Sequence, residues 1–312
     1  MDPILHAERL SVEHETLYRY AHPVEMAQHI ACLRPLNDAG QTLEQFEMTV
    51  QPEPAQHSTR RDAFGNSRAY FALNAAHSEL SVVARSEVQV RHRYVGLNPL
   101  RGATCGEVRE LLRYRAEAPF QAASEFAYAS PFVPLHDELR EYAASSLRAE
   151  RPLAEAAIEL MQRIHADFDY SPASTDISTP ILDVFERRKG VCQDFSHLML
   201  GCLRASGLAA RYVSGYLLTR PAAGQPALVG ADASHAWLSV WCPGLGQELA
   251  DDWLDLDPTN DCVPGTHHVR VAHGRDFGDV TPLRGVIRGG GKHTLLVRVT
   301  TRLLPDHAEE AV

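Results

Sequence analysis

At 312 residues, with 45% hydrophobic and 22% charged side chains, the chain has the composition of a soluble globular protein and suits one large domain or two smaller ones. Its 40 acidic and 30 basic side chains give a net charge of −10, which argues against nucleic acid or an anionic membrane as the main partner. The N-terminus has no basic segment followed by an apolar one, and no window approaches the ~20 apolar residues of a membrane span. We therefore expect a cytoplasmic location.

The cysteines and histidines give no sign of a metal site. Six cysteines are spread along the chain, and no pair has the C-x-x-C spacing of a zinc or redox site. The 16 histidines include one adjacent pair, His267 and His268, and no H-x-x-x-H pair on a helical pattern. We expect mostly free thiols, as in a reducing compartment, and no metal or cofactor.

The N-terminal third predicts strands. Gly65-Asn66 lies between two strand-like segments and indicates a hairpin. The residues 98–104 contain the Pro and Gly of a connection. The sequence therefore predicts an antiparallel β domain over residues 1–100. Its half-buried strands are indicated by alternating apolar and polar side chains at 10–20, 43–50 and 80–90.

From residue 105 the chain is rich in Ala, Leu, Glu and Arg at helical spacing, and a long helix is expected to end near Asp167. The Gly289-Gly290-Gly291 run predicts a turn between two closing strand-like segments, because no helix follows it. We predict a second domain over residues 101–312. Its further elements are a helix at about 192–206 and strands near 209–218, 235–242 and 252–257.

Cys192 is expected in the first turn of the helix at about 192–206. Unpaired N–H groups and the helix dipole favour an anion there, and the thiolate is the nucleophilic form of cysteine. The alternative is a buried cysteine that acts as a small apolar residue. That core role is assigned to Cys202, which belongs to an apolar stripe at helical spacing: Phe195, Leu198, Met199, Cys202 and Leu203.

A thiol nucleophile needs a base. His197 lies about 140° from Cys192 around the helix and is excluded. His235 opens an alternating strand and is the better candidate. That strand and "WLDLDPTN" flank a Pro/Gly-rich turn and predict an antiparallel hairpin. If His235 faces Asp257, Ser239 faces Trp253 and the turn falls at Gly246. Asp255 lies on the same face, so the hairpin leaves both acids open.

Three other acids are interpreted as structural. Asp194 lies about 200° from Cys192 around the helix, so we interpret it as a stabiliser of the first turn or a partner to the neighbouring loop. Asp276 and Asp279, in "GRDFGDV", fit turn positions better than positions lining a cleft.

The chain resembles the bacterial transglutaminase-like proteins, a branch of the papain-like cysteine enzyme superfamily. The resemblance covers residues 165–262, with three motif blocks in order: "RRKGVCQDFSHLMLGCLRASGLAARYVSGYL", "GADASHAWLSVW" and "WLDLDPTN". Residues 11–97 resemble the β-rich domain that often precedes this core. The resemblance implies an α+β fold in which a cysteine-bearing helix packs against an antiparallel sheet that carries the His and the Asp.

Carried over by position, the family's catalytic triad falls on Cys192, His235 and Asp257. The resemblance further implies an oxyanion site formed by the Cys192 backbone N–H. Tyr170 resembles the aromatic position that supplies a second donor in some relatives, and a packed tyrosine is the alternative interpretation.

Such a triad forms a thioester with an acyl carbonyl. With water as acceptor the enzyme is a cysteine peptidase or amidase on a peptide or protein substrate. We expect this activity because the sequence shows no amine channel and no calcium-binding loops. With an amine as acceptor it is a transglutaminase. Acetyl transfer from acetyl-CoA fits the motifs poorly. A non-catalytic binding protein is the remaining alternative, and the presence of all three triad residues argues against it.

Overall fold

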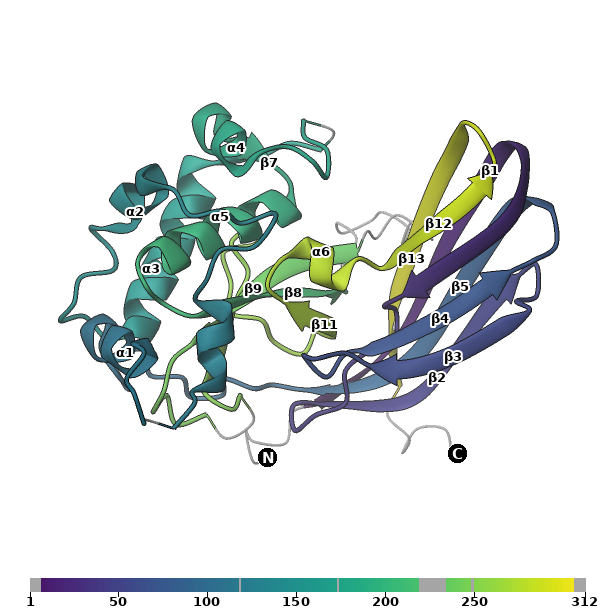
Figure 1. Ribbon diagram of the computed structural model, residues 1–312. Coiled ribbons are helices and arrows are strands. Elements are labelled where there is room, and N and C mark those ends of the chain that lie inside the picture. The colour runs from purple at the N-terminus through teal and green to yellow at the C-terminus, as the bar shows by residue number, and fades with distance from the viewer. Residues whose placement is uncertain (1–6, 118, 173, 219–233, 248–249, 306–312) are drawn as a thin grey trace, which may run out of the picture.

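The structure is a computed structural model that describes residues 7–117, 119–172, 174–218, 234–247 and 250–305. It contains a large antiparallel sheet, a four-stranded antiparallel sheet and a group of helices packed beside the smaller sheet (Figure 1). The predicted α+β fold is confirmed. Among the described residues, no helix is both long enough and apolar enough to cross a membrane.

The large sheet is organised around β1, which bends where its register against β5 shifts, between Arg19 and Val24. The two halves of β1 consequently lie in facing layers (Figure 1), and the apolar side chains between these layers form their own core. The strand order is β2-β5-β1-β4-β3. The strands are β1 (Ala7–Ala31), β2 (Gln41–Gln51), β3 (Gln56–Arg61), β4 (Ser67–Leu73) and β5 (His77–Arg91).

The predicted hairpin at Gly65-Asn66 is confirmed as the β3–β4 connection. Asp62 organises this loop because its Oδ1 accepts hydrogen bonds from the backbone N–H groups of Phe64 and Asn66, both at 2.9 Å. Gly65 has a φ of 85°, a backbone region that favours glycine.

The last two strands, β12 (Leu283–Gly289) and β13 (His293–Leu304), belong to the large sheet, each paired with a different half of β1. This differs from the expectation that residues 101–312 form one domain, since the β-rich unit is completed by the C-terminal end of the chain. Strand patterns do not specify which sheet a strand joins, and β1 needs a partner along its second edge. Gly289, Gly290 and Gly291 all have positive φ and form the predicted turn between β12 and β13.

The helices surround α5 (Cys192–Ala205). The predicted apolar stripe is confirmed, because all five of its residues are at most 1% exposed. The opposite side of α5 is also buried, since α2 and α4 pack against it. Gly201 permits this approach, because a Cβ there would lie 2.6 Å from Leu139 Cδ1. The other helices are α1 (Cys105–Leu112), α2 (Asp137–Ala143), α3 (Leu153–Asp167), α4 (Ile181–Arg187), α6 (Phe277–Val280) and a 3₁₀ turn at Ala122–Phe126.

The four-stranded sheet has the order β10-β9-β8-β11. The predicted β9–β10 hairpin exists, but its predicted register is wrong by two residues: Ser239 faces Asp255 instead of Trp253. The connection between β9 and β10 is two residues longer than predicted, because Trp241 pairs with Trp253 and not with Asp251. A shift of two preserves the face on which each side chain lies. The strands are β8 (Ala210–Leu217), β9 (Ser234–Trp241), β10 (Trp253–Leu256) and β11 (His268–Gly274).

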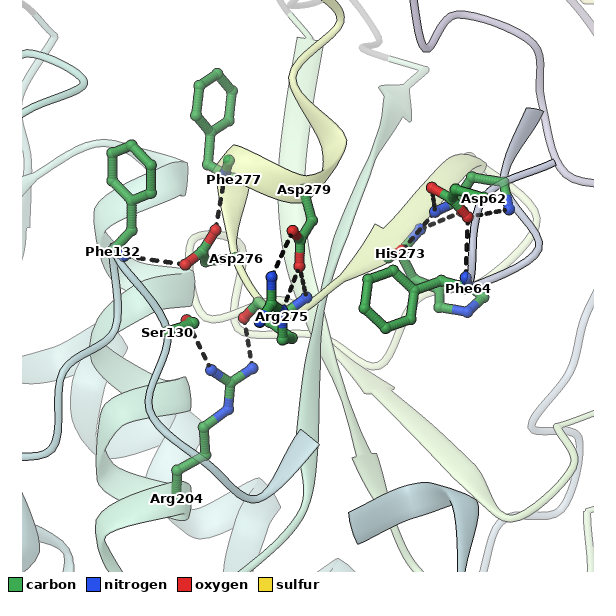
Figure 2. A network of polar contacts seen from close by, with 12 residues as sticks. Asp62, Phe64, Ser130, Phe132, Arg204, His273, Arg275, Asp276, Phe277 and Asp279 are labelled. Atoms are coloured by element: carbon green, nitrogen blue, oxygen red, sulfur yellow. Dashed lines mark hydrogen bonds and ion pairs between the residues drawn. The ribbon is translucent and has the colours of Figure 1, made fainter. Parts of the chain in front are cut away.

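The two sheets meet along β11. The side chain of Asn66 exchanges two hydrogen bonds with the backbone of His273, at 2.7 and 2.9 Å. Beyond β11, Arg275 pairs with Asp279, and Asp276 caps α6 and accepts the backbone N–H of Phe132 (Figure 2). The structural interpretation of Asp276 and Asp279 is therefore confirmed.

Buried histidines are expected to make the fold sensitive to acid. Burial lowers the pKa of His14, His29 and His197 to about 4. Below an ordinary histidine pKa of 6.5 the unfolded chain binds protons that these folded rings do not, so stability falls as the pH drops from 6.5 to 4. We expect the free energy of unfolding in urea to be lower at pH 5 than at pH 7, by at most about 2 kcal/mol per histidine.

His14→Gln is expected to reduce this pH dependence, whereas the exposed His22→Gln is not. Equal stability at the two pH values would contradict the prediction.

Candidate active site

Cys192 is the first residue of α5 and is partly exposed. Two short parallel strands, β6 (Asp169–Tyr170) and β7 (Lys189–Gly190), lead the chain into this position. The predicted placement of Cys192 at the start of a helix is confirmed.

Asp194 holds the first turn of α5 in place. Its Oδ2 accepts the backbone N–H of Val191 at 2.9 Å and the hydroxyl of Thr175 at 2.6 Å. Burial raises the pKa of Asp194, while these two donors oppose that shift. Gly190 leaves room for the carboxylate, since a Cβ there would lie 2.8 Å from Asp194 Cβ. Both structural roles expected for Asp194, in the helix turn and toward the loop, are present.

His235 lies at the start of β9, and its Nε2 is 2.7 Å from Asp257 Oδ2. The Cys192 side chain also interacts with the ring and favours its protonated form, and Nδ1 is the ring nitrogen that does not bind Asp257. His235 is buried, which favours the neutral ring, but the hydrogen bonds and charges of Asp257 and Cys192 outweigh burial and raise the pKa of His235 to about 10. The structure thus brings the three predicted residues together and favours the imidazolium form.

Asp257 is completely buried and follows directly on β10. Its Oδ1 accepts the backbone N–H groups of Thr259 and Asn260, at 3.0 and 3.2 Å. Its Oδ2 accepts Asn260 Nδ2 at 2.7 Å in addition to His235. Burial acts to raise the pKa of Asp257, but its histidine partners hold that pKa well below its usual value. The side chain is therefore a fixed anion.

Asp255, the acid that strand parity also allowed, is bound elsewhere. Its carboxylate accepts the hydroxyl of Ser239. Its backbone N–H donates to the Tyr94 hydroxyl at 2.8 Å. The two acids share a face of the sheet, but Asp257 is the one bonded to His235.

The remaining histidine and cysteine of α5 are core residues. His197 Nε2 accepts the backbone N–H of Phe277 at 3.2 Å, and its ring packs against Phe132 and Tyr212. Cys202 is fully buried, and burial raises its pKa to about 12. The exclusion of His197 as a base agrees with this packing.

Tyr170 lies close to Cys192. Its backbone pairs with Gly190, two residues before the cysteine, and its side chain is 55% exposed. Partial burial and the neighbouring Cys192 raise the pKa of the Tyr170 phenol. The hydroxyl is therefore protonated at neutral pH and available as a donor.

Sequence reasoning missed two residues of this site. Asn260 belongs to the "WLDLDPTN" block and His268 to an adjacent pair of histidines, and neither pattern predicts a role in this site. His268 Nε2 lies 3.1 Å from Asp257 Oδ2. His268 comes from β11, and Asp257 follows β10 at the other edge of the sheet. Spacing along the chain does not reveal that the assembled sheet brings these two side chains into contact.

His235, Asp257 and His268 are also residue types that bind metals, and their ligand atoms lie within 4.8 Å of one another. The sequence predicts no metal site, but its spacing test could not detect a group assembled from three separate segments. All three atoms are engaged in hydrogen bonds with one another, so we interpret the group as a hydrogen-bonded cluster.

Comparisons with known proteins agree with this fold. Residues 10–89 match the bacterial transglutaminase-like N-terminal region, and residues 140–258 match the transglutaminase-like superfamily. The uncharacterized protein Rv2569c of Mycobacterium tuberculosis is 40% identical over 296 residues, which are 94% of this chain and 92% of that protein. The protein-glutamine gamma-glutamyltransferase of Pseudomonas aeruginosa is 34% identical over 139 residues, 42% of this chain and 20% of that enzyme.

Among solved structures, a proposed cysteine protease from Cytophaga hutchinsonii has the same fold, with a TM-score of 0.72 at 17% identity over 96% of this chain and 92% of that one. Both parts of the chain, the β-rich unit and the helix-and-sheet core, are thus accounted for by one family. The chain belongs to the bacterial transglutaminase-like proteins of the transglutaminase-like superfamily, a family of cysteine-dependent enzymes.

Proposed function

We propose that the protein is a cysteine-dependent acyl-transfer enzyme that hydrolyses amide bonds of peptides or proteins through a thioester on Cys192. The observation that carries the proposal is the position of His235, which is hydrogen-bonded to buried Asp257 and interacts with the Cys192 side chain. An imidazole held between a thiol and a carboxylate is the arrangement that activates a thiol nucleophile.

The first half of the reaction forms the thioester. The Cys192 thiolate attacks the carbonyl carbon, and the carbonyl oxygen becomes an oxyanion. The Cys192 backbone N–H, which has no partner within the helix because it lies in the first turn of α5, and the Tyr170 hydroxyl are the proposed donors to that oxyanion. The His235 imidazolium then gives its proton to the leaving nitrogen, so that the C–N bond breaks and an amine or ammonia departs.

The second half restores the enzyme. Neutral His235 accepts a proton from water, the resulting hydroxide attacks the thioester, and the C–S bond breaks. The carboxylic acid leaves, and the thiolate–imidazolium pair is restored. Asp257 carries no proton in either half; it fixes the tautomer of His235 and stabilises the positive charge that forms there.

Transamidation is the second candidate function. It is supported by the similarity of 42% of the chain to the P. aeruginosa protein-glutamine gamma-glutamyltransferase. The thioester is the same, and an amine replaces water in the second half of the reaction. A non-catalytic binding role is disfavoured by the intact set of Cys192, His235 and Asp257, in which His235 is hydrogen-bonded to Asp257 and interacts with Cys192.

One experiment tests and separates these functions. Wild type and Cys192→Ala are incubated with a glutamine-containing peptide and a labelled amine, and both ammonia release and amine incorporation are measured. We expect Cys192-dependent ammonia release with little incorporation. Incorporation in excess of hydrolysis would establish transglutaminase activity. The proposal of an enzyme would be contradicted if the wild type formed neither product on peptide pools and Cys192 were no more reactive than the buried cysteines.

A further inference from the structure

Asp257 binds two histidines through the same oxygen. Its Oδ2 is 2.7 Å from His235 Nε2 and 3.1 Å from His268 Nε2, and the centres of the two rings are 6.1 Å apart. A triad requires only the first of these histidines. His268 therefore contacts the acid that orients the base.

The ring of His268 is held firmly. The residue begins β11 and is only 7% exposed. Its ring packs edge-on against Trp237, with the ring centres 5.3 Å apart at 81°. Its Nδ1 is buried and has no hydrogen-bond partner among the described residues. Within the described part of the chain, the ring therefore makes its polar contact with Asp257.

The hydrogen-bond direction follows from the chemistry of the two groups. An ionised carboxylate can only accept, so Nε2 of His268 donates to Asp257 Oδ2. This donor withdraws electron density from Asp257 Oδ2. His235 shares that oxygen, so a donor from His268 weakens the pull of Asp257 on the His235 proton.

The ionisable groups around this pair come from several elements. Asp257 faces His235 on β9, His268 on β11 and Cys262 in the turn that follows β10. Cys192 on α5 faces His235. The neighbouring His267 points elsewhere, to Glu8 at 3.0 Å.

The β-rich unit anchors the strand that carries His268. The backbone N–H of Arg270, two residues along β11, donates to Gln41 at 2.8 Å, and its guanidinium pairs with Asp38. Asn66 binds the other end of β11 through His273. Since β11 is fixed at both ends, His268 meets Asp257 at a defined position.

We propose that His268 is a positioning residue that acts through Asp257 to fix its carboxylate and to limit the basicity of His235. The inference rests on the proposed thiol chemistry. When the imidazole is less basic, its protonated form is a stronger acid. It then releases its proton more readily to the leaving nitrogen, and this is the step that breaks the amide bond.

Three substitutions of His268 distinguish the effect of its hydrogen-bond donor from the effect of its packed ring. Gln can place its amide N–H near the position of Nε2, so His268→Gln keeps the donor. Phe keeps a ring against Trp237 but lacks the donor. Asn is too short to reach Asp257. Thermal unfolding identifies which variants fold, and the Asn variant replaces the Phe variant if the latter does not.

The readout is the rate of Cys192 alkylation by iodoacetamide from pH 4 to pH 11, which needs no knowledge of the substrate. In wild type, a His235-dependent window of Cys192 reactivity is expected at neutral pH, because the imidazolium stabilises the thiolate. At its alkaline edge His235 loses its proton, and the rate changes to that of a thiolate without an imidazolium partner. In His268→Phe and His268→Asn the alkaline edge of this window, where His235 loses its proton, is expected to rise by about one pH unit. With the glutamine peptide, kcat is expected to fall about tenfold at unchanged KM. His268→Gln should resemble wild type in both measurements.

An unchanged alkaline edge in the Phe and Asn variants would overturn the inference. So would a Gln variant that behaves like the Phe variant, because the ring and not the donor would then matter. A wild type with no His235-dependent window would instead remove the proposed thiol chemistry, and the inference with it.

Discussion

Replacing Cys192 by alanine is expected to lower the rate of amide hydrolysis by at least about 10⁴-fold while leaving the fold intact, because the thioester cannot form without the thiol. Cys192 is partly exposed at a helix start, so its truncation creates no fully buried cavity. The measurement is ammonia release from the glutamine peptide, together with the thermal unfolding curve of each variant.

Cys105 offers a matched control within the same chain. It is also the first residue of a helix, α1, but it is fully buried, and burial raises its pKa. We expect Cys105→Ala to retain hydrolysis, and Cys105 to resist alkylation in the folded protein. If Cys105→Ala abolished activity and Cys192→Ala did not, the assignment of the nucleophile would be wrong.

The comparison of the two cysteines shows what sequence could predict about this site. Hydrophobic spacing placed Cys192 at the start of α5 and Cys202 in the core, and the helix angle excluded His197, all in agreement with the structure. A helix start alone, however, does not distinguish Cys192 from Cys105. The difference lies in burial and in a histidine partner that is 43 positions away, which only the tertiary fold provides.

Strand parity likewise predicted the face on which a side chain lies, but not its partner. The predicted β9–β10 register is wrong by two residues, yet it placed His235 and both acids on one face, because side chains alternate with a period of two. Parity could not choose between Asp255 and Asp257. The choice depends on where β10 ends, since Asp257 lies just beyond its last residue and turns back through the backbone N–H groups of Thr259 and Asn260.

The pairing of strands that are far apart in the chain could not be predicted from the sequence. The strands β12 and β13 read as strands, but their pairing with β1 joins residues more than 250 positions apart. The placement of His268 has the same origin, since β11 reaches Asp257 only through the assembled sheet and its contacts with the β-rich unit. Periodicity reports the local element and the face of a side chain, and it carries no information on which distant segment lies beside it.

Asp257→Asn is expected to reduce hydrolysis by roughly 10³- to 10⁴-fold, through the loss of charge more than of shape. His235 is buried, and without the carboxylate burial would favour its neutral form. The pKa of His235, now raised to about 10, should then fall toward or below its ordinary value of 6.5. Between these two values wild-type His235 is protonated and supports a thiolate, whereas the variant is neutral, so Cys192 alkylation near pH 7.5 should drop and recover only at higher pH.

The control for this prediction is Asp255→Asn, which changes the other buried acid on the same face of the sheet. Asp255 binds Ser239 and Tyr94, whereas the bond to His235 is made by Asp257, so replacing Asp255 should lower thermal stability but leave the pH dependence of Cys192 alkylation as in wild type. If the alkylation profile shifted in Asp255→Asn but not in Asp257→Asn, the acid that acts on His235 would be Asp255, and the assignment of Asp257 would be wrong. Equal shifts in both would mean that the charge of the whole face, and not one hydrogen bond to His235, keeps the imidazolium protonated.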